Sequence, residues 1–286
     1  MRAQQRCFAR SAALALLIGA APLANGKTRA DCEREYTPQL AQEGKDVIWE
    51  PTADSMVARM LEMAKVTAAD KVYDLGSGDG KIPIAASKLF GATAVGIEYD
   101  ADLVKHSRCL AEAEGVQARV TFIEGDIFEA DFSDATVVTV YLLPELNLRL
   151  RPTLLAMKPG TRVVSYSFTM GDWEPDDHID SYGAGAAYFW IVPANVDGLW
   201  TFRSARGGEG FEVELDQRFQ NLKGIVRGTA ATGEVTGDKI DFAFADDGEQ
   251  IRVTGAVDAD GIAATLTRGN TSTQYVGTRN PATRYD

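Results

Sequence analysis

Apolar and polar positions follow two different periods along this chain, and the change of period divides it into two parts. Between residues 52 and 168, short apolar runs typical of buried strands take turns with segments in which apolar residues recur every three or four positions, as in amphipathic helices. Helices are predicted at 52–66, 81–90, 101–114 and 145–157, and strands at 71–75, 94–98, 119–124, 136–142 and 161–168, with 186–193 as a further late strand. Such alternation predicts an α/β fold with a doubly wound, mostly parallel sheet and helices on both faces.

After residue 197 the pattern changes to strict alternation of apolar and polar residues, as in 211–215. Glycine and aspartate turns separate most of eight short runs, at 200–203, 211–219, 222–227, 232–236, 239–245, 250–257, 262–267 and 273–278. Short regular strands with such turns predict an antiparallel β-barrel or β-sandwich. This part has no histidine or cysteine, so we expect it to bind or to pack rather than to catalyse. Its Gly-Leu-Trp opening at 198–200 is weakly similar to that of lipocalin-like barrels.

The two patterns place domain boundaries on the chain. We expect a polar lead-in at 27–50, an α/β domain at 51–195 and an all-β domain at 196–286. Residues 1–26 are separate: arginines at 2, 6 and 10 precede an uncharged stretch rich in Ala and Leu, which ends in Ala24-Asn25-Gly26. This pattern is typical of a secretory signal peptide, and its apolar run is shorter than the roughly 20 residues of a membrane-spanning helix.

From this start we expect a cleaved, periplasmic or secreted protein with no stable membrane span. The alternatives are an N-terminus that stays uncleaved and tethers the chain to the membrane, and a cytoplasmic protein whose start only resembles a signal. Cys32 and Cys109 are the two cysteines beyond residue 26. One pair makes no disulfide framework, and we expect Cys109 to be a small buried side chain within a helix.

The chain is acidic, with 29 lysines and arginines against 41 aspartates and glutamates and a net charge of −12. Without residues 1–26, which carry three arginines and no acid, the net charge is −15. An acidic surface repels phosphate backbones, which argues against nucleic acid as a partner. It suits a cationic substrate, such as a protein with an accessible lysine or a small amine.

A glycine-rich loop joins the first predicted strand to the helix that follows. It reads Asp-Leu-Gly-Ser-Gly-Asp-Gly from residue 74 to residue 80, and it lets the backbone approach a ligand closely. A dinucleotide fingerprint requires a third small residue where this chain has Lys81, and the P-loop pattern G-x-x-x-x-G-K-[ST] is absent. Asp74 would lie beside a dinucleotide's pyrophosphate, whereas it suits a cationic ligand such as S-adenosylmethionine (SAM). A nicotinamide site and a purely structural turn are the alternatives.

If the ligand is SAM, its parts can be assigned to residues at successive strand ends, where doubly wound sheets bind their ligands. The loop residues Gly76, Ser77, Gly78 and Gly80 would line the methionine part. Asp74 would meet the ammonium group, and Glu98, at the end of the next strand, would accept hydrogen bonds from the ribose hydroxyls. Asp126 would accept from the adenine amino group, while Ile127 would cover the ring.

If the ligand is SAM, catalytic residues are expected at the end of the fourth predicted strand. It carries neither an Asn/Asp-Pro-Pro-Tyr motif nor an acid suited to Mg²⁺. Tyr141 can present its phenol oxygen to an acceptor amine, or it can be a buried strand tyrosine. Pro144 and Glu145 either border the acceptor site or simply begin the next helix. We expect no metal site: the segment around His178 has ligand-type residues, but it contains a proline and is predicted to be a solvated loop.

Several motifs together resemble a known family. They are W-E-P-T at 49–52, V-Y-D-L-G-S-G-D-G-K at 72–81, V-G-I-E-Y-D at 95–100, Y-L-L-P at 141–144, L-R-P at 150–152, K-P-G-T-R-V-V-S at 158–165 and M-G-D-W-E-P at 170–175. The glycine loop resembles the first motif of class I SAM-dependent methyltransferases. The whole set is similar to prokaryotic relatives of the ATP synthase c-subunit lysine N-methyltransferase family, over about residues 47–192.

This resemblance implies a Rossmann-like SAM-dependent methyltransferase domain at 51–195 that methylates a protein lysine. It places Pro51, Thr52, Glu145 and the stretch Tyr141 to Pro144 near an acceptor channel. It leaves the all-β domain unexplained. Two other functions stay open: methylation of a small molecule, and a non-catalytic periplasmic binding protein that keeps the fold. An exported enzyme would also lack an obvious supply of SAM, which is made in the cytosol.

Overall fold

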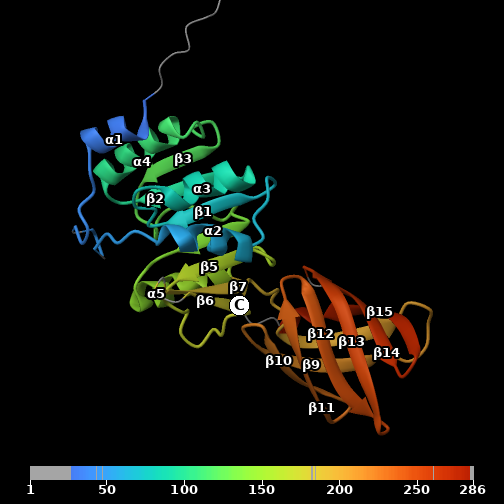
Figure 1. Ribbon diagram of the computed structural model, residues 1–286. Coiled ribbons are helices and arrows are strands. Elements are labelled where there is room, and N and C mark those ends of the chain that lie inside the picture. The colour runs from blue at the N-terminus through green and yellow to red at the C-terminus, as the bar shows by residue number, and fades with distance from the viewer. Residues whose placement is uncertain are drawn as a thin grey trace, which may run out of the picture.

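The computed structural model describes residues 27–42, 44–46, 48–181, 183, 185–259 and 261–283. Along the chain an α/β unit comes first and a closed β-barrel follows it (Figure 1). The predicted fold class is thereby confirmed, and the choice that the sequence left open between barrel and sandwich is decided for the barrel. The signal peptide predicted at residues 1–26 lies outside the described residues.

Seven strands form the sheet of the α/β unit, in the order β3-β2-β1-β4-β5-β7-β6. Their bounds are β1 Lys71–Leu75, β2 Thr93–Glu98, β3 Val120–Glu124, β4 Val137–Val140, β5 Arg162–Tyr166, β6 Asp177–Ser181 and β7 Gly185–Ile191. Neighbouring strands are parallel from β3 to β5, whereas β7 runs antiparallel to β5 and β6 antiparallel to β7. Every residue of β4 is buried, as expected of a central strand that is covered on both faces.

Helices cover both faces of this sheet. Their bounds are α1 Arg29–Glu35, α2 Asp54–Met63, α3 Lys81–Phe90, α4 Ala101–Ala113 and α5 Pro144–Leu155. Apolar residues of α2, α3 and α4 share one buried cluster with Val72 of β1, whereas those of α5 share another with Tyr73 and Leu75. Because successive side chains of a strand point to opposite faces, the two clusters lie on opposite sides of the sheet.

The edge of the sheet differs from the prediction. The segment around His178 was expected to be a loop, but residues 177–181 form β6, which pairs with β7 as an edge hairpin. The imidazole of His178 is nonetheless well exposed, in keeping with a solvated segment. Edge strands are often polar because they face solvent and because charged residues discourage pairing with another chain. Such a strand carries little of the hydrophobic alternation on which the sequence prediction relied.

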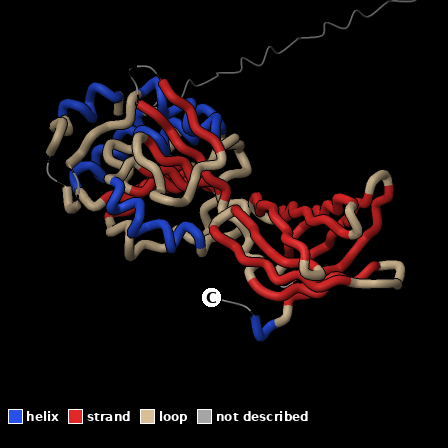
Figure 2. The backbone as a smooth tube through the Cα atoms, turned by 90° about the horizontal axis from the view of Figure 1, so that it is seen from below, coloured by secondary structure: helices blue, strands red, loops and turns tan. Residues whose placement is uncertain are grey.

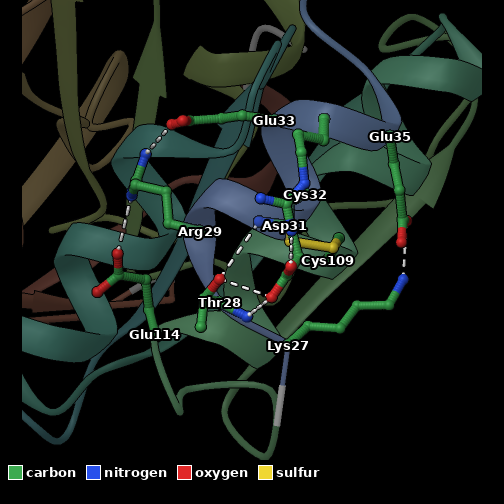
Figure 3. Close-up of a disulfide and its surroundings, with 10 residues drawn as sticks. Lys27, Thr28, Arg29, Asp31, Cys32, Glu33, Glu35, Cys109 and Glu114 are labelled. Carbon is green, nitrogen blue, oxygen red and sulfur yellow. Dashed lines mark hydrogen bonds and ion pairs between the residues drawn. A yellow bond between two sulfur atoms is a disulfide. The ribbon is translucent and has the colours of Figure 1, made fainter.

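A disulfide between Cys32 and Cys109 joins α1 to α4 (Figure 3). The expectation that Cys109 is only a small buried side chain was therefore wrong. The two residues lie 77 positions apart in the sequence, and the short helix that carries Cys32 is not evident in the hydrophobic pattern. Thr28 begins that helix with a capping box, in which its side chain and that of Asp31 each accept a backbone N–H of the other.

Eight antiparallel strands form the barrel, in the order β10-β11-β12-β13-β14-β15-β8-β9, and β9 pairs with β10 to close it. Their bounds are β8 Gly198–Ser204, β9 Phe211–Arg218, β10 Asn221–Val226, β11 Thr229–Thr236, β12 Lys239–Asp246, β13 Glu249–Asp258, β14 Gly261–Arg268 and β15 Thr271–Arg279. A short 3₁₀ helix, Pro281–Thr283, follows. Each of the eight predicted runs lies within or overlaps one of these strands. Along β9 the residues Phe211, Val213 and Leu215 are buried and alternate with exposed ones, which places the apolar side chains inside the barrel.

The barrel lies beside the β6–β7 edge of the sheet, with its axis pointing away from the α/β unit (Figures 1 and 2). Arg218 of the barrel pairs with Asp172 of the α/β unit at 2.7 Å. The ring of Phe219 stacks on the buried ring of Trp173, with 6.1 Å between centroids. None of the helices in the described part of the chain has the length and apolarity that a membrane crossing requires.

The disulfide generates a prediction about stability. Replacing Cys32 with Ala in residues 27–286 should lower the free energy of unfolding of the α/β unit by about 2–4 kcal/mol, because the unfolded chain then regains the freedom of a loop of 77 residues. Urea unfolding followed by helical circular dichroism measures this loss, since the helical signal comes almost entirely from the α/β unit. Cys109→Ala should give the same midpoint. Alkylation of both thiols in the folded, unreduced wild type would contradict the disulfide.

Candidate functional site

One cavity lies at the carboxyl ends of β1, β2 and β4, where the sequence placed the candidate residues. Its walls come from the lead-in, the glycine loop, the segments after β2 and β3, and the segment after β4. The predicted site residues that line it are Pro51, Thr52, Asp74, Gly76, Ser77, Gly78, Glu98, Asp126, Ile127 and Tyr141. Three others, Gly80, Pro144 and Glu145, are not among its lining residues.

The glycine loop is held against the end of β2 by its own backbone. The N–H groups of Gly76 and Ser77 both donate to the carbonyl of Ile97, at 2.9 and 3.0 Å. Gly78 has a φ of +53°, and a Cβ at this position would lie 2.6 Å from the indole nitrogen of Trp49. Only glycine therefore fits between the loop and the indole. From the sequence, the glycines are expected to let a ligand approach the loop backbone; at Gly78 it is the indole of Trp49, from the lead-in, that approaches it.

Gly80 serves packing rather than the cavity wall. It caps the start of α3 with a φ of +77°, and a Cβ there would lie 2.5 Å from the ring of Phe122. Pro144 and Glu145 occupy the first turn of α5. Glu145 is favourable there because the N-terminus of a helix carries partial positive charge. The structure confirms that both residues begin the helix, and their place near an acceptor channel stays a prediction.

Asp74 is a buried carboxylate at the end of β1. It is 4% exposed, and its side chain accepts a hydrogen bond from the hydroxyl of Thr139 at 2.7 Å. Burial raises the pKa of Asp74 to about 7, and the nearby carboxylates of Asp79 and Glu98 add to this effect. Burial also raises the pKa of Asp79. Three acids on one wall make this part of the cavity suited to a ligand with positive charge.

Glu98 is fixed to the glycine loop. One of its carboxylate oxygens accepts the N–H of Gly78 and the other accepts the N–H of Asp100, each at 2.9 Å. Its place at the end of β2, twenty residues after the loop glycine that it binds, suits the predicted role toward ribose hydroxyls. The two backbone donors hold the carboxylate at the cavity wall without neutralising its charge.

Asp126 has a partner that the sequence did not reveal. Its side chain forms an ion pair with Lys45, and it also accepts the N–H of Phe128 at 2.9 Å. The hydrogen bond from Lys45 is the main reason that the pKa of Asp126 lies below its ordinary value. Lys45 also lies 5.4 Å from the ring centre of Tyr99. The lead-in is thereby tied across the part of the cavity that was assigned to the adenine.

The opposite wall is aromatic. The ring of Tyr141 packs edge-on against Tyr166, with 4.6 Å between centroids, and lies parallel to Phe168 at 6.4 Å. Burial raises the pKa of Tyr141, and the negative charge of the nearby Glu50 carboxylate raises it further. The carboxylate of Glu50 and the phenol of Tyr141 therefore lie close together on this aromatic wall. This arrangement can receive an ammonium or amine.

Sequence reasoning missed several cavity residues, above all in the lead-in. Lys45, Trp49 and Glu50 line the cavity, yet only Trp49 and Glu50 belonged to a recognised motif, and neither was assigned a role. Their position directly before Pro51 was the available signal. Within the described residues, no group of three or more His, Cys, Asp or Glu side chains is placed to hold a metal ion.

Comparisons with known proteins point to one chemistry. The model of the ANTKMT methyltransferase domain family matches residues 74–177. A protein-lysine N-methyltransferase of Saccharolobus islandicus is 46% identical over 131 residues, which are 45% of this chain and 81% of the relative. The human ATP synthase c-subunit lysine N-methyltransferase is 33% identical over 147 residues, 51% of this chain and 61% of the relative.

A solved structure extends the similarity. The crystal structure of an RNA methyltransferase from Salinibacter ruber in complex with S-adenosyl-L-homocysteine (SAH) is 51% identical to this chain, with a TM-score of 0.50. The match covers 51% of this chain and 96% of that one. Together with the acid-lined cavity, these relatives make SAM the cofactor. The buried acids fit its cationic groups.

Asp74 generates a prediction about pH. Because its pKa of about 7 lies above the ordinary value, the carboxyl is mostly neutral at pH 5.5 and meets the SAM ammonium as an anion only at higher pH. The affinity for SAM should therefore rise at least tenfold from pH 5.5 to pH 7.5, with nearly one proton released on binding at pH 6. Titration calorimetry in two buffers of different ionisation enthalpy measures both quantities.

Asp74→Asn is the control for this prediction. It should bind SAM weakly, with no proton release and little dependence on pH. Without ligand the same variant should melt at a higher temperature than wild type at pH 8 but not at pH 4, because burial penalises only the ionised carboxylate. Equal proton release by variant and wild type would contradict the assignment.

Proposed function

This chain belongs to the class I SAM-dependent methyltransferases of the family that includes the ATP synthase c-subunit and adenine nucleotide translocase lysine N-methyltransferases, and we propose that it methylates lysine side chains of proteins. The observation that carries the proposal is the 46% identity to the Saccharolobus islandicus protein-lysine N-methyltransferase, across 81% of that protein. The chain spans 61% of the length of the human relative. The identity of the methylated protein is a separate question.

The two walls of the cavity divide the work of the reaction. Bound SAM supplies a methyl group on a positively charged sulfur, which the lone pair of an amine takes directly. On the acidic wall, Asp74 would hold the ammonium of the cofactor and Glu98 its ribose. On the aromatic wall, Glu50 and Tyr141 would orient the acceptor nitrogen. Catalysis then rests mainly on positioning a neutral amine in line with the methyl group, after its proton has passed to water.

The mouth of the cavity suits a macromolecular acceptor. Ile48, Tyr99 and Leu143 line the cavity, and they are 56%, 55% and 44% exposed. Large apolar side chains that stay in contact with water around a site are typical of surfaces that bind another protein. The rim therefore favours a lysine presented on a protein surface over a free amine.

RNA is the competing acceptor, because the Salinibacter ruber relative is described as an RNA methyltransferase. We favour protein, since the chain has a net charge of −12 and the lead-in and loop that line the cavity carry Asp46, Glu50 and Asp79. A phosphate backbone would be repelled by these groups, whereas a lysine ammonium would be attracted.

Transfer of a labelled methyl group tests the acceptor class. Residues 27–286, incubated with methyl-labelled SAM and a lysate of the source cell, should label protein, and hydrolysis should yield methylated lysine. Label that a ribonuclease releases would identify RNA as the acceptor and overturn the proposal. Intact masses of the labelled proteins would show whole methyl increments.

Glu50→Gln should lower kcat/KM for the lysine acceptor by about tenfold to a hundredfold, because the acceptor loses its anionic partner. Its dissociation constant for SAM should change less than threefold, since Glu50 belongs to the aromatic wall. Glu62→Gln is the matched control: it makes the same change at an exposed position of α2 that does not line the cavity, and its kinetics should stay those of wild type. Equal losses in both variants would remove Glu50 from the acceptor site.

We further propose that the mature chain is exported. The disulfide between Cys32 and Cys109 supports this proposal, because such bonds persist mainly in oxidising compartments. The sequence of residues 1–26 supports it independently, since its basic start and apolar run are those of a signal peptide. The two observations come from separate parts of the chain and point the same way.

Fractionation of cells that produce the full chain with a C-terminal tag tests export. The tagged protein should leave the cytosol, begin at Lys27 and carry no free thiol. A cytosolic protein that begins at Met1 and has reactive cysteines would contradict export and leave the activity untouched. A protein that begins at Met1 but sediments with membranes would show the tethered form instead of the cleaved one.

A further inference from the structure

The two ends of the barrel are unlike. The end near the α/β unit is closed from inside: the indole N–H of Trp200 donates to the carbonyl of Val196 at 2.8 Å, and the guanidinium of Arg279 lies 4.8 Å from the centre of the Trp200 ring. Trp200 is fully buried, and Arg279 is 4% exposed. The turn at Phe219, which touches Trp173, belongs to this same end.

The far end is open. It holds a cavity of about 330 Å³, whose apolar lining is Phe211, Phe244, Ile251, Leu266 and Tyr275. Since the near end is plugged and the far end is not, the barrel is a cup. Eight-stranded barrels have an interior wide enough either to be filled by side chains or to hold one small ligand. In this barrel, side chains fill the near end, and the far end leaves a cavity large enough for one small ligand.

Charged residues surround the opening of the cup. Asp246 points inward, as the continuation of the buried series of β12, and its side chain is only 17% exposed. It forms ion pairs with Arg268 and Arg227, and Arg227 also pairs with Glu209 at 2.9 Å. Placing charges at inward positions is costly for a barrel that only has to pack. A polar opening above an apolar chamber is what a ligand with two unlike ends requires.

The floor of the cup limits the kind of ligand. Phe202 and Phe211 stack almost parallel, with 4.9 Å between centroids and 5° between planes, so aromatic rings close the chamber one layer below the opening. Phe244 and Tyr275 flank Phe211, at 5.6 and 5.8 Å. Such a shallow aromatic chamber receives a ring system or a short hydrocarbon chain, whereas a long acyl chain would meet the floor.

We propose that the far end of the barrel binds one small amphiphilic molecule, with its apolar part on the Phe211, Phe244 and Tyr275 rings and its polar head at the Arg227, Asp246 and Arg268 opening. The site lies at the end of the barrel opposite its attachment to the α/β unit, so it is separate from the methyl-transfer cavity. The proposal does not depend on the proposed function, since a barrel without any transferase would keep this cup.

Fluorescent probes test the site. 1-Anilinonaphthalene-8-sulfonate and the uncharged N-phenyl-1-naphthylamine share an apolar body and differ in the head group. Residues 27–286, saturated with SAH so that the cofactor cavity is filled, should bind one molecule of each probe. The sulfonate should bind at least threefold more tightly, because the arginines at the opening can meet it.

Thr273→Trp is the decisive variant. Thr273 lines the cavity from β15, and an indole there fills the chamber without replacing a core residue, so the affinity for both probes should fall at least tenfold. Thr278→Trp is the matched control, because Thr278 is exposed on the outer face of the same strand; its affinities should stay within twofold of wild type.

Two results would overturn the proposal: a folded Thr273→Trp protein that binds as tightly as wild type, or equal losses in both variants. If Thr273→Trp lowers the melting temperature of the barrel, Thr273→Met narrows the same chamber with a flexible side chain, and it should still weaken both probes. Unchanged binding by a folded Thr273→Met protein would then count against the cup.

Discussion

The cavity of this protein depends on a carboxylate that the fold buries without giving it a cation among its described contacts. Asp74 lies on β1, where the strand order reverses: β2 pairs with one edge of β1 and β4 with the other. The hydroxyl of Thr139 on β4 donates a hydrogen bond to its carboxylate. Burial alone would favour the neutral acid, and the carboxylates of Asp79 and Glu98 favour it further. A positively charged ligand reverses this balance, because it stabilises the anion that burial disfavours. The buried carboxylate therefore favours cationic ligands, and it lies at the strand ends where doubly wound sheets bind their ligands.

The lead-in turns that open strand edge into a cavity, and it is held at successive points along its length. These are the disulfide from Cys32 to Cys109, the edge-on contact of Tyr36 with His106, the hydrogen bond from Gln42 to Asp100, the ion pair of Lys45 with Asp126 and the packing of Trp49 on Gly78. Exposed ion pairs contribute little by themselves, so the covalent link is the strongest of these points, followed by the half-buried indole of Trp49. Together they bring Glu50 to the aromatic wall. The disulfide at Cys32 therefore helps to fix the position of Glu50 at the acceptor side of the cavity, although Glu50 lies some twenty residues later in the chain.

The sheet and the barrel could be predicted from the sequence because both repeat. Strands buried on two faces and strands buried on one face have different hydrophobic periods, and each left its own pattern. The glycine loop was also predictable, since its positive φ angles leave few residues to choose from. What the sequence did not reveal depends on contacts between distant positions. Lys45 looks like any polar residue until Asp126 lies beside it, and Cys109 looks like a small apolar residue until α1 brings Cys32 to it. Strand β6 was missed because an edge strand needs no apolar face.

The position of the barrel bears on what it does for the enzyme. It contacts the segment between β5 and β6, for example through Arg218 with Asp172, while the cavity opens at the ends of β1, β2 and β4. A domain that closed over the acceptor would have to reach those strand ends, and the described contacts of the barrel include none there. Its apolar interior is a core cluster of its own, and its closed ring of strands leaves no unpaired edge. The barrel therefore adds a binding function at a distance from the chemistry, and the exposed apolar rim of the cavity remains free to meet the acceptor.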